Sequence, residues 1–238
     1  MLDPMQRWRQ YGEKPDYAGP LSFGGVPCTQ DAAELAGFDV AIVGAPMDEL
    51  VSDRPGARFA PRAIRTASCP PGPHLETKVD AFEELRIVDF GDAAVVPAQP
   101  EVSHAAIEET VREVVDAGLM PLIIGGDHSI TAPNARAVAA VLAAGVLPVI
   151  LGGDHSITEP NARACAKVHG PIGLVHFDTH TDTGEGVFGA ILSHGTVMRT
   201  IVDEGVIDPR RYVQIGLRGY WPGEAEFSWQ AERGITSL

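Results

Sequence analysis

Residues 172–182 read Ile-Gly-Leu-Val-His-Phe-Asp-Thr-His-Thr-Asp. The apolar half of this stretch, residues 172–177, predicts a buried strand of a parallel sheet. Side chains of an extended chain alternate between two faces, so Asp178, His180 and Asp182 should project to the same side where this strand ends. Burying two carboxylates without partners is costly, and a cation offsets that cost. We therefore predict a metal site, with a solvated polar loop as the alternative.

Strands and helices alternate along most of the chain. Residues 103–117 carry apolar side chains at helical spacing, with Ser103 as the predicted N-cap and Gly118 as the stop signal. Further buried strands are predicted at residues 38–44, 85–89, 120–124, 147–151 and 212–217. This order predicts an α/β fold, with three α/β/α layers around a mainly parallel sheet. In such folds the ligand groups lie at the C-terminal ends of the strands, where the predicted metal site falls.

Length and composition fit one soluble domain over residues 1–238, in which residues 1–36 form an irregular N-terminal arm. Acidic residues outnumber basic ones 32 to 18, for a net charge of −14. This charge argues against nucleic acid as a partner and is compatible with a small cationic substrate. The longest apolar run, residues 137–151, is too short and too interrupted to cross a membrane. Three scattered cysteines and an N-terminus unlike a signal peptide predict a cytoplasmic protein.

A segment of the chain occurs twice. Residues 120–141 and 147–168 share 16 identities in 22 positions, at an offset of 27 residues, and both contain Gly-Gly-Asp-His-Ser-Ile-Thr. This period corresponds to one strand and one helix. We therefore predict a tandem duplication of one strand–helix unit, at residues 120–146 and 147–168, and no solenoid, which needs more copies. Asp127 and Asp154, one in each copy, are expected to accept hydrogen bonds from loop amides.

The histidine of the repeated segment is a further candidate ligand. The glycines before it permit a close approach to a site at the end of the preceding strand. His155, in the second copy, precedes Asp178 by 23 residues, which is one helix and one strand. Adjacent parallel strands would bring these two side chains together. His128 holds the same position in the first copy and is the alternative, although the spacing to Asp178 favours His155.

Several motifs between residues 38 and 220 resemble those of the ureohydrolases, the family of arginase and agmatinase. In chain order they are Gly44-Ala-Pro46, Arg54-Pro-Gly-Ala-Arg-Phe59, Pro61-Arg-Ala-Ile-Arg65, Val88-Asp-Phe-Gly-Asp92, Gly152-Gly-Asp-His155, His176–Asp182, Ser193-His-Gly-Thr196 and Gln214-Ile-Gly-Leu-Arg-Gly219. The residues of these motifs are more similar to those of agmatinases than to those of arginases. The resemblance implies an arginase-like fold and a hydrolase acting on the C–N bonds of linear amidines.

The resemblance also implies a metal centre. In this family a pair of Mn²⁺ ions shares a hydroxide, which attacks the guanidinium carbon and releases urea and an amine. The metal ligands it implies here are His155 (or His128 in its place), Asp178, His180 and Asp182. Asp178 would bridge the two ions.

Substrate, proton transfer and assembly are also implied by the resemblance. Agmatine, giving putrescine and urea, is the expected substrate, and guanidinobutyrate, guanidinopropionate and proclavaminate-type compounds stay open. His194 is expected to assist proton transfer near the substrate, with a loop-capping role as the alternative. Arg54, Arg58 and Arg218 are expected to organise loops or subunit contacts. A homo-oligomer, a trimer or a hexamer, is implied.

The sequence departs from the family's pattern in two places. The family's site uses a later Asp-x-Asp motif, one residue of which bridges the metals, and residues 183–238 contain none. We therefore expect a C-terminally truncated chain with an incomplete second metal site and an exposed sheet edge. A non-catalytic family member is the competing hypothesis. Asp48-Glu-Leu50 also replaces the Asp-Gly-Gly type of turn, which leaves the conformation of that loop open.

Overall fold

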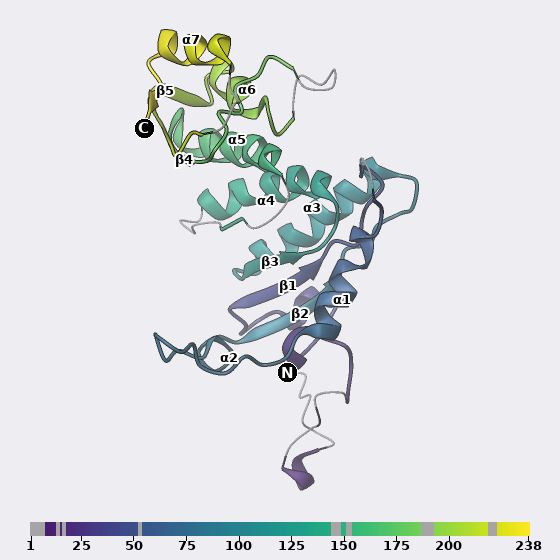
Figure 1. Cartoon of the computed structure of the whole chain (residues 1–238). Helices are drawn as coiled ribbons and strands as arrows, with labels where there is room; N and C mark the ends of the chain where they lie inside the picture. The colour runs from purple at the N-terminus through teal and green to yellow at the C-terminus, as the bar shows by residue number, and fades with distance from the viewer. Residues whose placement is uncertain are drawn as a thin grey trace. The chain divides into compact units, whose positions relative to one another are not determined.

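The computed structural model describes residues 8–12, 15, 18–51, 54–143, 149–150, 154–186, 193–218 and 223–238. It divides into two compact units, Met1–Ala137 and Val138–Leu238, and the boundary falls within helix α4 (Thr131–Ala143) (Figure 1). Each unit has a three-stranded parallel sheet of its own. Whether the two units form one domain, as predicted for residues 1–238, stays a prediction.

The first unit is built around strand β1. Its sheet has the order β2-β1-β3, and both neighbours run parallel to β1. The strands and longer helices are β1 (Val40–Gly44), α1 (Ala60–Ala67), α2 (Ala81–Glu84), β2 (Ile87–Asp92), α3 (Pro100–Asp116), β3 (Met120–Ile124) and the start of α4. Short 3₁₀ turns occur at Arg9–Tyr11, Phe23–Gly25, Ala32–Glu34, Ala57–Phe59 and His128–Ile130. The described part of residues 1–36 contains only such turns and a bridge between Cys28 and Asp89.

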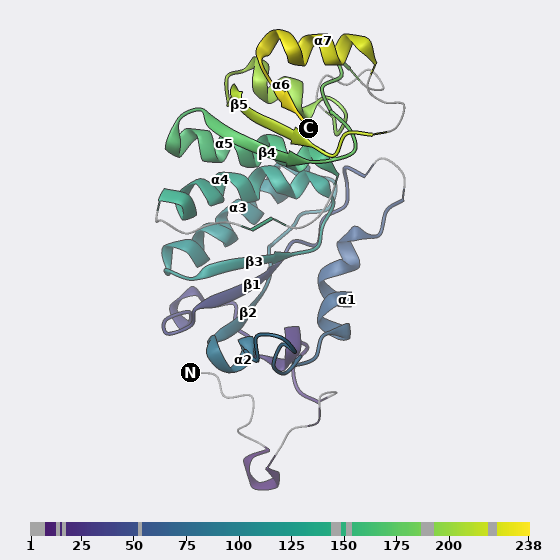
Figure 2. The same ribbon diagram turned by 60° about the vertical axis from the view of Figure 1, so that its left-hand side comes forward.

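The connections between these strands explain the layers. β1 leads through α1 and α2 to β2 on one side, and β2 leads through α3 to β3 on the other side of β1. Crossover connections between parallel strands are right-handed, so two connections in opposite directions place α1 and α3 on opposite faces of the sheet. Figure 2 shows this arrangement. The predicted α/β fold, with a parallel sheet between helical layers, is confirmed.

Helix α3 begins earlier than its sequence pattern indicated. Its first residue is Pro100, whose fixed φ suits the first turn of a helix. Ser103, the predicted N-cap, is instead a buried helical residue: its hydroxyl donates to the Val96 carbonyl at 3.1 Å and accepts from the Val96 N–H at 2.9 Å. The predicted stop at Gly118 is confirmed, because its φ of +81° is a conformation that favours glycine.

The loop after β1 is organised by Asp48. This carboxylate is 2% exposed, accepts the Gly56 N–H at 2.6 Å and forms an ion pair with the Arg58 guanidinium. Asp127, which follows β3, accepts the Leu50 N–H of the same loop at 2.9 Å. Arg58 therefore organises a loop, as expected. The Asp48-Glu-Leu50 turn, whose conformation the sequence left open, is held at both ends by buried carboxylates.

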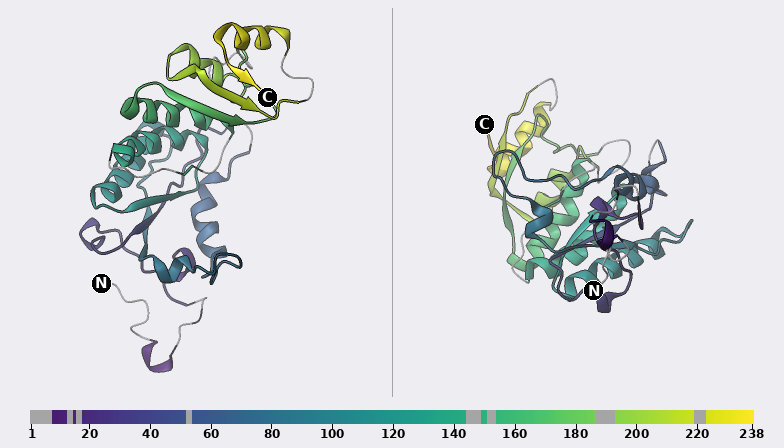
Figure 3. Two further views of the ribbon diagram at one scale, coloured as in Figure 1. Left: turned by 90° about the vertical axis from the view of Figure 1, so that its left-hand side faces the viewer. Right: turned by 90° about the horizontal axis from the view of Figure 1, so that it is seen from below.

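The second unit continues from α4 through a 3₁₀ turn at His155–Ile157 to a sheet of order β4-β5-β6. Its elements are α5 (Thr158–His169), β4 (Ile172–Phe177), α6 (Val197–Asp203), β5 (Ile207–Ile215), α7 (Glu224–Arg233) and β6 (Thr236–Ser237). Residues of α5, α6 and α7 share one hydrophobic cluster with β5, around Tyr212 and Trp229. The three strands run side by side in the green-to-yellow part of Figure 3. β6 begins two residues after Gly234.

Strand β4 is an exposed edge within the described part of the chain, where it pairs with β5 alone. Val175 and Phe177 lie on the face opposite His176 and are 60% and 76% exposed. The strand predicted at residues 147–151 lies largely outside the described residues, and Val149 and Ile150 are not in a strand. No helix among the described residues has the length and apolar character needed to cross a bilayer.

Candidate metal centre

Strands β4 and β5 position Asp178 at the C-terminal end of the second sheet. The strands are paired in parallel, with His176 opposite Gln214. The Asp178 N–H continues this ladder by donating to the Ile215 carbonyl at 3.1 Å. His176 and Asp178 are two residues apart on an extended chain and point to the same face. The prediction that Asp178 lies at the end of a parallel strand is confirmed.

Beyond Asp178 the chain turns, so the simple alternation of faces does not extend to Asp182. The His180 N–H donates to Asp178 Oδ1 at 2.9 Å and closes the first part of the turn. Asp182 has a φ of +51°, in the left-handed region that side chains other than glycine rarely adopt. The Met198 N–H at the start of α6 donates to its carbonyl at 3.0 Å. Strained residues of this kind recur at functional sites.

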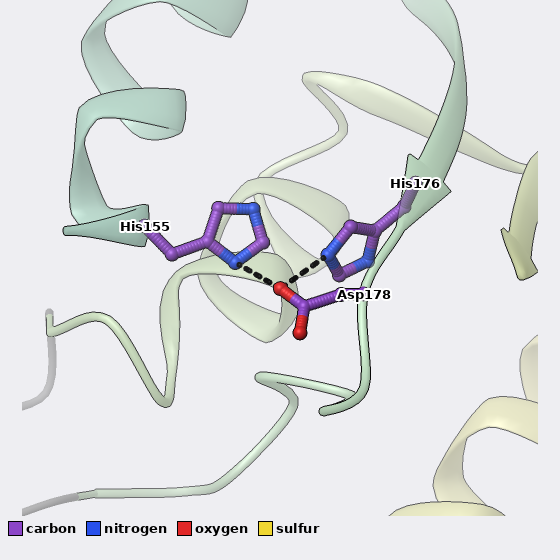
Figure 4. Close-up of side chains that lie close together, drawn as sticks. All are labelled: His155, His176 and Asp178. Atoms are coloured by element: carbon purple, nitrogen blue, oxygen red, sulfur yellow. Dashed lines mark hydrogen bonds and ion pairs between the residues drawn. The ribbon is translucent and has the colours of Figure 1, made fainter. Parts of the chain in front are cut away.

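His155 reaches both carboxylates from the start of the second repeated helix. Asp154 accepts the Ser156 N–H at 2.9 Å and the Ser156 hydroxyl at 2.7 Å, which forms the 3₁₀ turn that carries His155. His155 Nδ1 lies 3.6 Å from Asp178 Oδ2 and 2.5 Å from Asp182 Oδ2. Figure 4 shows the His155 ring directed at the Asp178 carboxylate. Three of the residues predicted as ligands therefore converge.

His176 also belongs to this group, although we did not predict it as a site residue. Its ring lies beside that of His155, with centroids 4.6 Å apart, and its Nε2 lies 3.3 Å from Asp178 Oδ2 (Figure 4). Ligand atoms of His155, His176 and Asp178 all lie within 4.8 Å of one another. The alternation that placed Asp178 on one face of the strand applies equally to His176. That pattern could have identified it from the sequence.

His180 and His194 lie at the border of the cluster and are more exposed. His180 Nδ1 is 3.6 Å from Asp178 Oδ1, and its side chain is 54% exposed. His194 Nδ1 is 3.8 Å from Asp154 Oδ2, next to the turn that carries His155. The ligand role of His180 and the proton-transfer role of His194 stay predictions.

The first copy of the repeat has the same local structure. Asp127 accepts the Ser129 N–H at 2.8 Å and the Ser129 hydroxyl at 2.6 Å, as Asp154 does for Ser156. The expected role of both aspartates, as acceptors for loop amides, is therefore observed. His128 lies half-buried in the first unit. Within the second unit, the converging group of donors contains His155. The choice between His155 and His128 as the ligand stays a prediction.

Burial and hydrogen bonds shift the pKa values of the ionisable side chains in and behind the cluster, and at Asp178 they act in opposite directions. Burial alone would raise the pKa of Asp178, but hydrogen bonds from the His180 N–H and the His176 ring outweigh it, so this pKa is lowered. Burial, with the neighbouring His155, lowers the pKa of His176. Burial raises the pKa of Tyr212 well above its ordinary value. Asp178 is thus held as a carboxylate, and Tyr212 keeps its hydroxyl proton.

The donor set fits a divalent metal that prefers oxygen and imidazole nitrogen. His155, Asp178 and Asp182 contribute one imidazole and two carboxylates, and their side chains are 22%, 25% and 11% exposed. One imidazole cannot balance two partly buried negative charges, whereas a divalent cation can. Among the described residues no cysteine thiol belongs to the group, which favours Mn²⁺ over a structural zinc ion.

The fold and the cluster define a parallel α/β protein with converging His and Asp side chains at the end of a strand. The chain belongs to the Arginase family, which it matches over residues 38–141 and again over residues 134–238. The first match contains the first copy of the repeated segment and the second match contains the second copy.

Individual relatives agree with this family. The chain is 36% identical over 224 residues to a guanidinobutyrase of Pseudomonas aeruginosa, covering 94% of this chain and 62% of the relative. It is 38% identical over 203 residues to a mitochondrial agmatinase of Gallus gallus, covering 84% and 51%. The solved proclavaminate amidino hydrolase of Streptomyces clavuligerus has a TM-score of 0.53 at 30% identity, covering 94% and 65%. The chain thus spans about half to two-thirds of these proteins.

Proposed function

We propose that this protein hydrolyses a small guanidino compound to urea and an amine. We further propose that agmatine, which gives putrescine, is its substrate and Mn²⁺ its cofactor. The observation that carries this proposal is the convergence of His155 Nδ1 on the carboxylates of Asp178 and Asp182 in an arginase-family chain. The net charge of −14 favours a cationic substrate.

Four residues would hold the metal: His155, Asp178, His180 and Asp182. Mn²⁺ bound there would supply Lewis acidity, which makes a water molecule ionise near neutral pH. The family resemblance implies two ions, for which these four residues are an incomplete set. The Asp178 carboxylate, which would be one of the ligands, lies between His155 on one side and His180 on the other.

The reaction also needs a proton donor. Hydrolysis forms a bond between a water oxygen and the guanidinium carbon and breaks the bond from that carbon to the substituted nitrogen. The departing amine must take up a proton. His194 is exposed at the border of the cluster and can carry this proton. Asp154 lies beside it, with Oδ2 3.8 Å from His194 Nδ1.

Urea release tests the proposal. The full chain is loaded with Mn²⁺ and incubated with agmatine, guanidinobutyrate, guanidinopropionate and arginine, and urea is measured. We expect urea from agmatine and its loss in Asp182→Asn. The matched control is Asp208→Asn, since Asp208 is an acid of the same unit at the opposite end of β5, where its carboxylate accepts the Arg210 N–H at 3.1 Å. If a Mn²⁺-loaded chain releases no urea from any of these guanidines, the proposed activity is wrong.

The competing proposal is a family member that binds metal without catalysis. It is favoured by one observation, namely that four of the predicted ligands lie at the cluster among the described residues, although the family resemblance implies two ions. Metal analysis separates the two proposals. Two Mn²⁺ ions per chain together with turnover would refute the non-catalytic proposal. One ion without turnover would support it.

Assembly and location stay proposals as well. We propose a homo-oligomer, either a trimer or a hexamer, and a location in the cytoplasm. Light scattering of the purified chain measures the first. Fractionation of the source cells measures the second, for which a mitochondrial location, as in the name of the Gallus gallus relative, is the alternative outcome.

A further inference from the structure

A chain of buried polar side chains lies behind the candidate metal centre. Gln214 and Tyr212 are both fully buried and lie two residues apart on β5, so they share a face. In the sheet register Gln214 is the partner of His176 on β4. His176 stands between this pair and the Asp178 carboxylate. Hydrogen-bond contacts therefore lead from the buried pair Gln214 and Tyr212, through His176, to the proposed ligand Asp178.

The distances define which atoms donate along this chain. Gln214 Nε2 lies 2.8 Å from the Thr181 carbonyl, 2.7 Å from the Tyr212 hydroxyl oxygen and 3.0 Å from His176 Nδ1. The Tyr212 hydroxyl lies 2.9 Å from His176 Nδ1. The Gln214 amide nitrogen can only donate, and its two protons are used by the Thr181 carbonyl and the Tyr212 hydroxyl oxygen. The Tyr212 hydroxyl proton then has His176 Nδ1 as its acceptor. Nδ1 is therefore an acceptor, and the ring proton is on Nε2.

The orientation of the Gln214 amide is fixed by the same contacts. Exchanging its nitrogen and oxygen would set two oxygens 2.8 Å apart at the Thr181 carbonyl, and neither could donate. In the observed orientation Gln214 Oε1 is buried without a hydrogen-bond partner among the described residues. Leaving one acceptor unpaired costs less than opposing two acceptors in a buried site.

We infer that His176 is a positioning residue of the proposed metal centre and not one of its ligands. It donates from Nε2–H to Asp178 Oδ2, over 3.3 Å, and it is held in that tautomer by Tyr212 and Gln214. The His180 N–H holds the other oxygen, Oδ1, at 2.9 Å. Each carboxylate oxygen thus has one fixed donor and keeps a lone pair for a cation. This inference rests on the proposed function only in taking Asp178 as a ligand.

The tautomer can be measured without substrate or manganese. Long-range ¹H–¹⁵N NMR of the metal-free full chain distinguishes a protonated Nε2 from a protonated Nδ1, and His176→Phe assigns the signals. We expect His176 to be protonated at Nε2, and we expect that proton to remain when Zn²⁺, a diamagnetic probe, is added. A proton on Nδ1, or loss of the Nε2 proton on adding Zn²⁺, would overturn the inference. Neither result depends on urea release. A failure of the inference about His176 can therefore be distinguished from a failure of the proposed activity, which the urea assay tests.

Two variants test the consequence for metal affinity. His176→Phe keeps a ring but removes the donor, and it should weaken Mn²⁺ binding by about 10- to 100-fold, as is typical when a partner of a metal ligand is lost. His176→Gln keeps an N–H donor at a similar reach and should recover most of this loss. Leu174→Ala, on the same strand face but in contact with the core, is the control for general loosening. Unchanged affinity in His176→Phe, or equal losses in both variants with the fold intact, contradicts the inference.

Discussion

The buried ion pair of the first unit allows a stability prediction with a measurable size. Arg65, on α1, donates to both oxygens of Asp89 at 2.7 and 2.8 Å, to Asp92 at 2.5 Å and to the Gly91 carbonyl at 2.9 Å. The side chains of Arg65 and Asp89 are 6% and 2% exposed. Arg65→Met keeps most of the apolar stem and removes the charge. Asp89 is then left buried without its cation, which costs about 3–5 kcal/mol.

Hydrogen exchange measures this loss where it occurs. Peptides covering β1 and β2 report the opening of the sheet on which Asp89 lies. A loss of about 3–5 kcal/mol corresponds to exchange faster by roughly 100-fold to 4,000-fold, since each 1.4 kcal/mol is about tenfold. We expect this acceleration in Arg65→Met, with β4 and β5 much less affected.

The matched control is another arginine–aspartate pair of the same unit. Arg86 also donates twice to one carboxylate, that of Asp39, at 2.9 and 2.5 Å, but its side chain is 64% exposed. Exposed pairs contribute little because water already solvates both charges. Arg86→Met should therefore leave exchange in β1 and β2 nearly unchanged. If Arg65→Met has no larger effect than Arg86→Met, burial is not what makes the first pair important, and the reasoning is refuted.

Three further predictions concern charge, the repeat and the exposed strand. Hydrogen bonds from Arg86 lower the pKa of Asp39 from 3.8 to about 2, so the stability that this pair contributes, which is small because water screens both charges, is present above the ordinary pKa and lost as pH falls toward 2. Carboxyl NMR should find that midpoint, and Arg86→Met should return it toward 3.8. His155→Ala should weaken Mn²⁺ binding by at least about tenfold while His128→Ala leaves it nearly unchanged, as measured by calorimetry; the reverse result would identify the first copy as the ligand. Val175→Lys changes the exposed face of β4 and should reduce concentration-dependent self-association, measured by light scattering, without lowering the melting temperature. Equal self-association of the variant and the unchanged protein would contradict this prediction.

The strands were predictable where apolar runs are bounded by glycine or polar residues. β3 and β4 occupy the predicted residues 120–124 and 172–177 because each is a short, mostly apolar run. The start of β5 was not predictable, since its first half contains Asp208, Pro209 and two arginines, which resemble a turn. That half lies near the sheet end and pairs through an irregular register, so tertiary pairing overrides the local pattern.

The candidate site was predictable in its residues but not in its geometry. The alternation along β4 correctly placed Asp178, yet Asp182 approaches His155 through a strained turn that no period describes. The contacts of His176 depend on Tyr212 and Gln214, more than thirty residues further along the chain. The register that brings them together is a property of the sheet. A single strand's sequence does not specify it.

The repeat shows how the same residues acquire different surroundings. Both copies form an aspartate-capped 3₁₀ turn and a helix, because the cap depends only on Asp, His and Ser in sequence. The segments after the two helices differ. α4 leads into the second copy of the repeat, whereas α5 leads directly into β4 and so to Asp178. The histidine at the start of the helix can share a cation with carboxylates only where the helix is followed by a strand that ends in those carboxylates. Among the described residues, the second copy is the one that leads directly into such a strand, so a repeated ligand sequence does not imply a repeated site.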